Sequence, residues 1–275
     1  MQPRSWLFVP ADSEKKIKKA LDSDADAIIF DLEDSVAPSM KPVARELLKG
    51  LKERSGGPEW WVRINPLGSE FIRDDLELIG LADVRGIVLP KAESGADVTE
   101  LAHRTGNIPI HAIVTETAAS LFGLLSYRQP GSPLAAMSWG AEDLSAALGA
   151  SSKYDADGKL AFTYRMARSL CLAGAVAAGV QPVDGVFADF RDDEGLREEA
   201  EEARREGFTG KLAIHPAQVP VINAAFTPSP EDVAHAEEIV AAFEAQPDAG
   251  VLSVGGKMVD RPHLVQARRV LERAR

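Results

Sequence analysis

Eight short apolar segments alternate with longer amphipathic segments along most of the chain. Most of the apolar segments lack a regular alternation of polar residues, which is typical of strands covered on both faces. The longer segments predict helices; residues 13–21, for example, place Ile17, Ala20 and Leu21 on one face and lysines on the other. The predicted strands are residues 5–9, 27–31, 60–64, 86–89, 110–114, 135–139, 184–188 and 211–214.

This repeated strand-then-helix order predicts a single α/β domain, a parallel (β/α)8 TIM barrel. A doubly wound sheet is the alternative, but no glycine-rich dinucleotide loop follows the first predicted strand. We expect the barrel to occupy residues 1–228. Residues 229–275 carry helical patterns at 230–245 and 262–274 on either side of a glycine-rich segment, 248–260. We therefore expect a C-terminal extension of helices with a lid segment, not an independent domain.

Charge and composition exclude several classes of protein. With 31 Lys and Arg against 42 Asp and Glu in 275 residues, the net charge is −11, which argues against nucleic-acid binding. No apolar run is long enough to span a bilayer, and the N-terminus lacks the features of a signal peptide. The one cysteine, Cys171, excludes an intramolecular disulfide and is expected to be a buried thiol. We expect a cytoplasmic protein without nucleic-acid or membrane partners.

Ionisable residues follow seven of the eight predicted strands, at the end of a barrel where catalytic groups lie. They are Asp31, Glu33 and Asp34, then Arg63, Lys91, Glu116, Glu142 and Asp143, and finally Asp189 and His215. So many carboxylates at one mouth repel each other unless a cation is present. Oxygen ligands favour a hard cation such as Mg²⁺, although residue types alone leave the two ligands open.

Arg63 and Lys91 supply positive charge to this mouth, suited to an anionic substrate or a developing enolate. A divalent ion beside a guanidinium, without a nucleophilic Cys or Ser motif, suggests carbonyl chemistry with enolate stabilisation. A Schiff base on Lys91 is the alternative, but a lysine amid acids keeps a high pKa. Asp31, Glu33 and Asp34 are expected to order water and hold neighbouring side chains rather than to touch substrate.

Nine short motifs run in order along almost the whole chain. They are LFVPADSEKKIKKA at 7–20, DLEDSVAP at 31–38, VRINP at 62–66, LPKAES at 89–94, ETAASL at 116–121, GAEDL at 140–144, DFRDDEGL at 189–196, GFTGKLAIHPAQ at 207–218 and GGKMVDRP at 255–262. In these motifs the chain resembles the citrate lyase β-subunit-like branch of the aldolase/citrate lyase superfamily, close to citramalyl-CoA and malyl-CoA lyases. The motifs are specific for the family and leave the acyl group open.

The resemblance implies roles for four residues at the reacting end of the substrate. Glu116 and Asp143 would be the Mg²⁺ ligands, with Mn²⁺ as an alternative metal, and Glu116 would also adjoin the substrate. Arg63 would bind the acyl-thioester oxygen and steady its enolate. Asp260 would be the catalytic carboxylate, which in the family reaches the site of an adjacent subunit from a mobile lid. From sequence alone, Asp260 could instead be a turn residue before Pro262.

The resemblance also implies a CoA-binding group. Lys15 and Lys19 resemble the residues that hold the CoA phosphates in the family. On a helix they lie at i and i+4, so both ammonium groups point the same way, as a polyphosphate requires. A solvated helix face is the alternative for this lysine pair. Ile214 and His215 match a contact to the pantetheine or adenine end of the cofactor. Phe8 stands where family members often have tyrosine, which removes the hydroxyl of that substrate contact.

Together these residues predict a Mg²⁺-dependent carbon–carbon lyase. It would cleave a β-hydroxyacyl thioester of the citryl-, malyl- or citramalyl-CoA type into acetyl-CoA or a homologue and a keto acid. The thioester enolate formed in this step would be protonated by Asp260. The alternatives are a citryl-ACP lyase subunit of a citrate lyase complex, which would dock an acyl carrier protein, and a class II pyruvate aldolase for 2-keto acids. The resemblance implies a homotrimer or a dimer of trimers, with the lid acting in trans.

Overall fold

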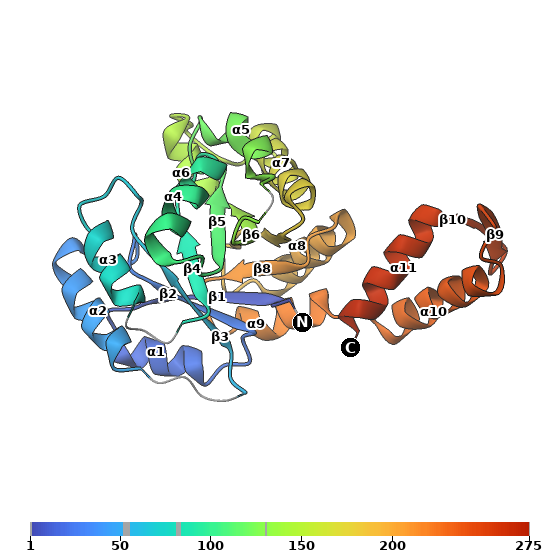
Figure 1. Ribbon diagram of the computed structural model, residues 1–275, viewed down its shortest axis with the longest axis horizontal. Helices are drawn as coiled ribbons and strands as arrows, with labels where there is room; N and C mark the ends of the chain where they lie inside the picture. Colours follow the sequence, from blue (N-terminus) through green and yellow to red (C-terminus); the bar gives the residue numbers. More distant parts are fainter. Residues whose placement is uncertain (1, 52–55, 81–83, 130, 275) are drawn as a thin grey trace. The chain divides into compact units, whose positions relative to one another are not determined.

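Eight parallel strands close into a barrel in sequence order, so the predicted (β/α)8 fold is confirmed (Figure 1). The computed structural model describes residues 2–51, 56–80, 84–129 and 131–274. The last strand pairs with the first, placing Ser5 opposite Lys211. The strands are β1 (Ser5–Pro10), β2 (Ala27–Asp31), β3 (Glu59–Arg63), β4 (Gly86–Leu89), β5 (Ile110–Val114), β6 (Leu134–Trp139), β7 (Gln181–Asp184) and β8 (Gly210–Ala213).

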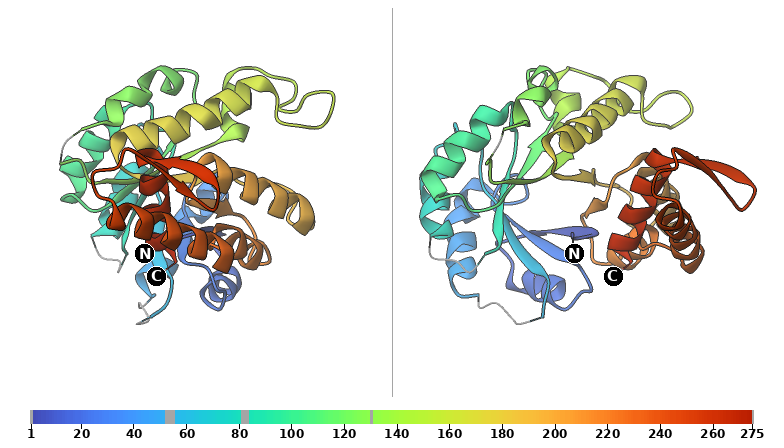
Figure 2. Two further views of the ribbon diagram at one scale, coloured as in Figure 1. Left: turned by 90° about the vertical axis from the view of Figure 1, so that its right-hand side faces the viewer. Right: turned by 45° about the vertical axis from the view of Figure 1, so that its right-hand side comes forward.

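Helices follow the strands and surround the barrel (Figure 2). Several begin at residues whose side chains cap them: Ser13 Oγ accepts from Lys16 N at the start of α1, and Ser94 with Asp97 forms a capping box at α4. The helices of this part are α1 (Glu14–Leu21), α2 (Lys41–Lys49), α3 (Ile72–Ile79), α4 (Gly95–Thr105), α5 (Ser120–Gly123), α6 (Ala141–Ala147), α7 (Phe162–Ala178), α8 (Asp193–Glu206) and α9 (Gln218–Phe226), with 3₁₀ turns η1 (Pro38–Met40) and η2 (Leu124–Tyr127).

The barrel interior is packed with apolar side chains to which every strand contributes. The edges and faces of Trp6 and Trp61 meet there, with ring centroids 5.0 Å apart. Gly86 makes room for this packing, because a Cβ at that position would lie 2.4 Å from Trp61 Cζ3. The cluster comprises Trp6, Ala27, Ile29, Trp61, Val88, Ile113, Ala136, Val183 and Leu212. Since the interior is filled, chemistry is confined to the strand ends and their loops.

The seventh predicted strand was wrong in its position along the chain. Residues 184–188 were expected, whereas β7 is Gln181–Asp184. The apolar run at residues 185–188 lies after the strand, whereas β7 begins with Gln181 and Pro182, which the apolar pattern did not identify. Two residues of β7 are buried polar groups with specific partners. Gln181 Nε2 donates to the carbonyl oxygen of Pro3 at 2.7 Å, and Asp184 pairs with Lys211. Asp189, expected directly after this strand, therefore lies in the following loop, where it accepts a hydrogen bond from the backbone of Arg191.

Residues 224–274 form a second compact unit, while residues 2–223 form the first. This unit holds α10 (Pro230–Ala245), β9 (Val251–Val254), β10 (Lys257–Asp260) and α11 (Arg261–Arg273). The strands form an antiparallel hairpin, so the predicted lid segment is a β-hairpin that ends at Asp260. Its turn consists of Gly255 and Gly256 at φ +56° and +77°, where side chains are disfavoured. The predicted division after residue 228, with a dependent extension, stays a prediction.

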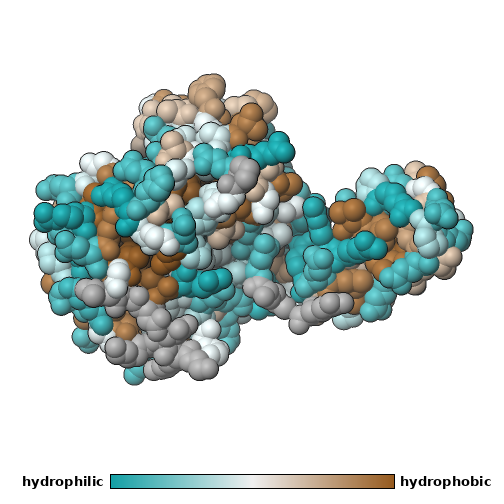
Figure 3. Space-filling model, in the orientation of Figure 1, coloured by the Kyte–Doolittle hydropathy of each residue, from teal (hydrophilic) through white to brown (hydrophobic). Residues whose placement is uncertain are grey.

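Large apolar side chains are exposed on α5, η2 and the start of α7. Phe122 is 91%, Leu125 77% and Phe162 71% exposed. Figure 3 shows hydrophobic residues gathered at the surface over α5. Exposed apolar area of this kind often marks a contact with another protein. Among the described residues, no helix is both long and apolar enough to cross a membrane.

A buried ion network ties the last two strands to the helices outside them. Lys211 Nζ lies 2.7 Å from Asp184 Oδ2, and Arg168 Nε of α7 lies 2.8 Å from Asp184 Oδ1. Lys211 also lies 2.7 Å from Glu199 of α8. Burial disfavours the charged form of Asp184, but the two cations outweigh it and hold the pKa of this carboxyl well below its usual range. The network therefore depends on all its charges being present together.

We predict that Lys211→Met lowers the free energy of unfolding by about 3–5 kcal/mol, because Asp184 would be left buried with one cation fewer. Urea unfolding at pH 7 measures this, with Lys16→Met on the exposed face of α1 as the control. The control should change stability by less than about 0.5 kcal/mol. A loss below about 1 kcal/mol in Lys211→Met would contradict the importance of the network.

Candidate active site

Arg63 and Asp31 form a bidentate ion pair at the ends of neighbouring strands. The parallel register of β2 and β3 sets these two residues opposite each other. Arg63 Nε and Nη2 each lie 2.6 Å from one oxygen of Asp31, a planar two-bond geometry that holds the guanidinium firmly. Asp31 also accepts from the backbone N–H groups of Glu33 and Ser35. The guanidinium carbon lies 4.7 Å from the centre of the Phe8 ring, so the ring makes a cation–π contact with Arg63.

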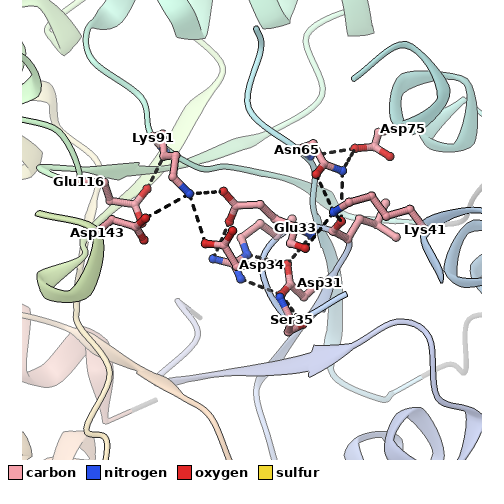
Figure 4. A network of polar contacts seen from close by, with 12 residues as sticks. Asp31, Glu33, Asp34, Ser35, Lys41, Asn65, Asp75, Lys91, Glu116 and Asp143 are labelled. Carbon is pink, nitrogen blue, oxygen red and sulfur yellow. Dashed lines mark hydrogen bonds and ion pairs between the residues drawn. The ribbon is translucent and has the colours of Figure 1, made fainter. Parts of the chain in front are cut away.

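Glu33 joins Arg63 to Lys91 (Figure 4). One of its oxygens lies 2.9 Å from Arg63 Nη1 and the other 2.6 Å from Lys91 Nζ. The Lys91 ammonium also lies 3.2 Å from an oxygen of Asp34 and 3.2 Å from an oxygen of Asp143. Burial opposes the charge, but these carboxylates outweigh burial and raise the pKa of Lys91 well above its usual range. A protonated ammonium cannot form a Schiff base, which supports the choice made from sequence.

Glu116 is buried directly after β5, next to Asp143 in Figure 4. Its Oε2 accepts from the backbone N–H of Lys91 at 2.5 Å. Gly140 leaves space for it, since a Cβ there would lie 2.8 Å from Glu116 Cγ. Lys91 and Thr115 both have positive φ, +52° and +63°, which is strained for side-chain-bearing residues. Burial, together with the nearby charge of Asp143, raises the pKa of Glu116 to about 8.

Glu116 and Asp143 are suited to a divalent cation. A carboxyl group whose ionisation is opposed by burial and a neighbouring carboxylate gains most from positive charge. Mg²⁺ characteristically binds proteins through one or two carboxylates and completes its shell with water and substrate oxygens. Among the described residues, no group of three His, Cys, Asp or Glu side chains could hold a metal. The two neighbouring carboxylates, with water and substrate oxygens, suit the oxygen ligation of Mg²⁺.

Three of the predicted CoA-binding residues line a cavity of about 630 Å³. Lys15 and Lys19 of α1 line it together with His215, which follows β8. Lys19 Nζ lies 3.5 Å from His215 Nε2. Burial and the charge of Lys19 lower the pKa of His215, which favours its neutral imidazole. The structure thus brings three of the four predicted CoA residues to one concave surface.

Ile214 is not among the residues that line this cavity. Its backbone N–H donates to Gln218 Oε1 at 2.8 Å, so that donor is already used inside the chain. The His215 ring packs against Phe190, with ring centroids 4.6 Å apart. The sequence did not point to Gln218 or Phe190 as supports of this corner.

Asp260 belongs to the second compact unit, where it ends β10 and caps α11. Its Oδ1 lies 2.5 Å from Nδ1 of His263, three residues further on, and this contact lowers the pKa of the carboxyl. Both side chains are exposed. The alternative of a turn residue before Pro262 is therefore wrong, because Asp260 is the last residue of a strand and the helix begins at the next residue. The catalytic role of Asp260 stays a prediction.

Sequence reasoning missed a buried polar group behind the Arg63 pair. Lys41 and Arg45 of α2 and Asp75 of α3 are buried, and Asn65 links them to the strand ends. The signal available in the sequence was weak. On α2 the apolar Val43 is exposed whereas the charged Lys41 and Arg45 face inward, the reverse of an ordinary surface helix.

Comparison with known proteins identifies the family of the chain. A sequence profile described as HpcH/HpaI aldolase/citrate lyase matches residues 4–216. The chain belongs to this family. A (3S)-malyl-CoA thioesterase of Cereibacter sphaeroides is 41% identical over 277 residues, covering 98% of this chain and 94% of that protein. A mitochondrial citramalyl-CoA lyase of Rattus norvegicus is 36% identical over 294 residues, covering 98% and 85%.

Among solved structures, CitE of Mycobacterium tuberculosis in complex with magnesium, acetoacetate and coenzyme A is similar to this HpcH/HpaI family member, with a TM-score of 0.85. The two are 39% identical, and the match covers 98% of this chain and 97% of CitE. The family expected from the nine motifs is confirmed. At the level of the family, the relatives also bear out the predicted lyase class and the magnesium cofactor.

The raised pKa of Glu116 predicts a pH-dependent stability in metal-free protein. The unfolded carboxyl ionises near pH 4.5, whereas the folded one stays protonated up to about pH 8. The unfolded state therefore releases its proton first, and stability conferred by protonated Glu116 is lost as pH rises through this window. The glutamine in Glu116→Gln cannot ionise. The free energy of unfolding of this variant minus that of the wild type should therefore increase by about 1 kcal/mol for each pH unit between pH 5 and 8.

Urea unfolding of both proteins in EDTA across this range measures the difference, and every other titrating group is common to both. A difference that stays constant with pH would show that Glu116 is ionised throughout, in contradiction to its buried setting.

Proposed function

We propose that this protein is a Mg²⁺-dependent lyase that cleaves the carbon–carbon bond of a β-hydroxyacyl-CoA thioester, of the malyl- or citramalyl-CoA type. The products are acetyl-CoA or a homologue and a keto acid. The observation that carries this proposal is Arg63, held rigidly by Asp31 and Glu33, in the same mouth as the adjacent carboxylates Glu116 and Asp143. The family relatives named for such lyases, and the CitE complex with magnesium and CoA, support it. The single buried cysteine agrees with action in the cytoplasm.

Glu116 and Asp143 would hold the metal ion. When bound, Mg²⁺ would polarise the hydroxyl and carboxylate oxygens of the substrate as a Lewis acid, and Mn²⁺ suits the same oxygen ligands. Lys91 holds Asp143 with its ammonium and Glu116 with its backbone N–H, so one residue orients both ligands.

Arg63 would stabilise the enolate oxygen of the thioester. A guanidinium has five N–H donors, and among the described residues the hydrogen bonds of Arg63 to Asp31 occupy two of them, while Nη1 also forms an ion pair with Glu33. The contacts with Asp31 and Glu33 hold the guanidinium plane in one orientation. Its remaining N–H groups therefore do not have to reorient when negative charge develops on the thioester oxygen. Preorganised donors of this kind contribute most to rate, about 10²–10³-fold for each one removed.

The cavity beside α1 would take the CoA moiety. Lys15 and Lys19 offer two ammonium groups to its phosphates from one helix face, and Lys18 also lines the cavity. The lowered pKa of His215 favours its neutral form, which would pack against the adenine or pantetheine without electrostatic repulsion from Lys19. An acyl carrier protein thioester is the alternative carrier, and the lysines would then meet an acidic partner surface.

We further propose that Asp260 protonates the enolate carbon from the lid of an adjacent subunit in a homotrimer or a dimer of trimers. The exposure of Phe122, Leu125 and Phe162 supports a subunit contact on α5, η2 and α7 (Figure 3). In the cleavage direction Asp260 would first take the proton of the substrate hydroxyl and then give it to the enolate carbon. In the reverse, condensing direction its carboxylate, whose pKa the contact with His263 lowers, would act as the base.

A second candidate is hydrolysis of the thioester bond. The specific observation behind it is the 41% identity to a (3S)-malyl-CoA thioesterase. The same Arg63 could bind the acyl oxygen while water attacks the thioester carbon. The products differ, since hydrolysis releases malate and free CoA whereas the lyase releases acetyl-CoA and glyoxylate.

We predict that the purified protein with Mg²⁺ releases acetyl-CoA and the keto acid from malyl-CoA or citramalyl-CoA, and that EDTA abolishes the release. Chromatography of the CoA species with enzymatic determination of the keto acid measures both products. Free CoA without acetyl-CoA would replace the lyase by the thioesterase. Turnover of only an acyl carrier protein thioester would place the chain in a lyase complex, and turnover of 2-keto acids alone would indicate a class II aldolase.

The lid proposal predicts complementation between two inactive variants. Arg63→Lys and Asp260→Asn should each retain less than about 1% of wild-type activity, because each lacks one reacting group. Co-expression with two affinity tags yields mixed oligomers. If the lid acts in trans, isolated mixed trimers should recover up to about a third of wild-type activity, since one of their three sites joins an intact Arg63 to an intact Asp260. No recovery in isolated mixed oligomers would show that Asp260 acts within its own subunit or has no catalytic role.

A further inference from the structure

Lys41 is a buried lysine whose ammonium is held by amide oxygens. It opens α2 and is 4% exposed. Its Nζ donates to the carbonyl oxygens of Leu32 at 2.6 Å and Glu33 at 2.9 Å, and to Asn65 Oδ1 at 2.8 Å. These bonds use all three N–H groups of the ammonium. A buried charge is costly to keep, so a lysine placed here for packing alone would be a poor choice.

The two carbonyls that Lys41 binds belong to the loop that grips Arg63. Leu32 lies between Asp31 and Glu33, whose side chains supply every carboxylate contact of Arg63 in the described part of the chain. The backbone N–H of Leu32 donates to the carbonyl oxygen of Arg63 at 2.9 Å. The loop is therefore fixed by β3 on one side and by the Lys41 ammonium on the other (Figure 4). A displacement of its peptide groups would turn both carboxylates away from Arg63.

A second layer of hydrogen bonds holds Lys41 and its loop in place. Asn65, two residues after Arg63, donates from Nδ2 to the carbonyl oxygen of Leu32 at 3.1 Å and to Asp75 Oδ2 at 2.7 Å. Asp75 is fully buried, and Arg45 Nε donates to its other oxygen at 2.8 Å. This chain of contacts connects helices α2 and α3 to the ends of β2 and β3.

We propose that Lys41 is a positioning residue for the reaction: by holding the Leu32 and Glu33 carbonyls it fixes the loop that aims Arg63. The kinetic part of its test rests on the proposed function, whereas the measurement of Arg63 Nε–H exchange does not. Lys41 touches no reacting atom in this account, and its effect on catalysis passes through Arg63.

The test compares Lys41→Met with Lys211→Met, an equally buried lysine whose partners belong to the outer wall of the barrel. Both variants are studied under conditions in which their unfolding curves show them folded. In Lys41→Met we expect kcat to fall about 100-fold, as for a misaimed catalytic group, with KM for the thioester and Kd for Mg²⁺ changed less than about threefold. In Lys211→Met kcat should stay within about twofold of the wild type despite the lower stability.

Two further readouts separate positioning from general weakening. In the Arg63→Lys background, Lys41→Met should lower kcat by less than about threefold, because the group through which it acts is already gone. The Arg63 Nε–H signal in ¹H–¹⁵N spectra, identified by its loss in Arg63→Lys, should exchange with water at least about tenfold faster in Lys41→Met and unchanged in Lys211→Met.

Equal losses of kcat in the two lysine variants, or a loss from Lys41→Met that is undiminished in the Arg63→Lys background, would overturn the proposal. If Lys41→Met does not fold, Asn65→Ala serves, since it removes one of the three acceptors and should give the same pattern with a kcat loss of about tenfold. Unchanged Arg63 Nε–H exchange in Asn65→Ala would likewise overturn it. If the wild type cleaves no thioester, the proposed function fails, and the exchange measurement still decides the role of Lys41.

Discussion

The ion pair between Arg63 and Asp31 is the interaction on which the rest of the site depends. Burying two charges is unfavourable unless their geometry is good and their remaining hydrogen bonds are satisfied. Here the register of β2 and β3 supplies the geometry, and the backbone of the loop after β2 supplies the additional hydrogen bonds to Asp31. Glu33 and the Phe8 ring then hold the guanidinium from two further directions. The orientation of the Arg63 guanidinium is therefore set by the protein before substrate binds.

The acidic character of the mouth follows from the same arrangement. Five carboxylates gather around Arg63 and Lys91. Burial raises the pKa of Glu116 to about 8, and repulsion by the nearby charge of Asp143 adds to this effect. A divalent cation between the strand ends would remove this conflict, which is why the residues fit Mg²⁺. The strained backbone at Thr115 and Lys91 fits the same reading, because it directs Glu116 toward a position that electrostatics alone disfavours.

Much of this architecture could be predicted from the sequence because it depends on short-range patterns. The strand–helix alternation identified the barrel, and the rule that chemistry lies after the strands found Asp31, Arg63, Glu116 and Asp143. Buried polar groups account for the errors. Strand β7 was placed too late in the chain because it begins with a buried polar residue, Gln181, and a proline, whereas the apolar residues 185–188 follow the strand. Lys41, Asn65 and Asp75 were missed as a network for the same reason, since their partners come from elements far apart in the sequence. The catalytic role that we propose for Asp260 involves an adjacent subunit, so it could not be tested on a single chain.

The most direct measurement of the central claim, that Arg63 stabilises a thioester enolate, is exchange of the acetyl-CoA methyl protons with deuterium. Acetyl-CoA is incubated with the protein, Mg²⁺ and pyruvate in D₂O, and loss of the methyl signal is followed by ¹H NMR. The account predicts exchange by the wild type that needs Mg²⁺ and slows at least about 100-fold in Arg63→Lys. Exchange that survives in Arg63→Lys, or consumption of a β-hydroxyacyl thioester by a protein that never exchanges these protons, would contradict it.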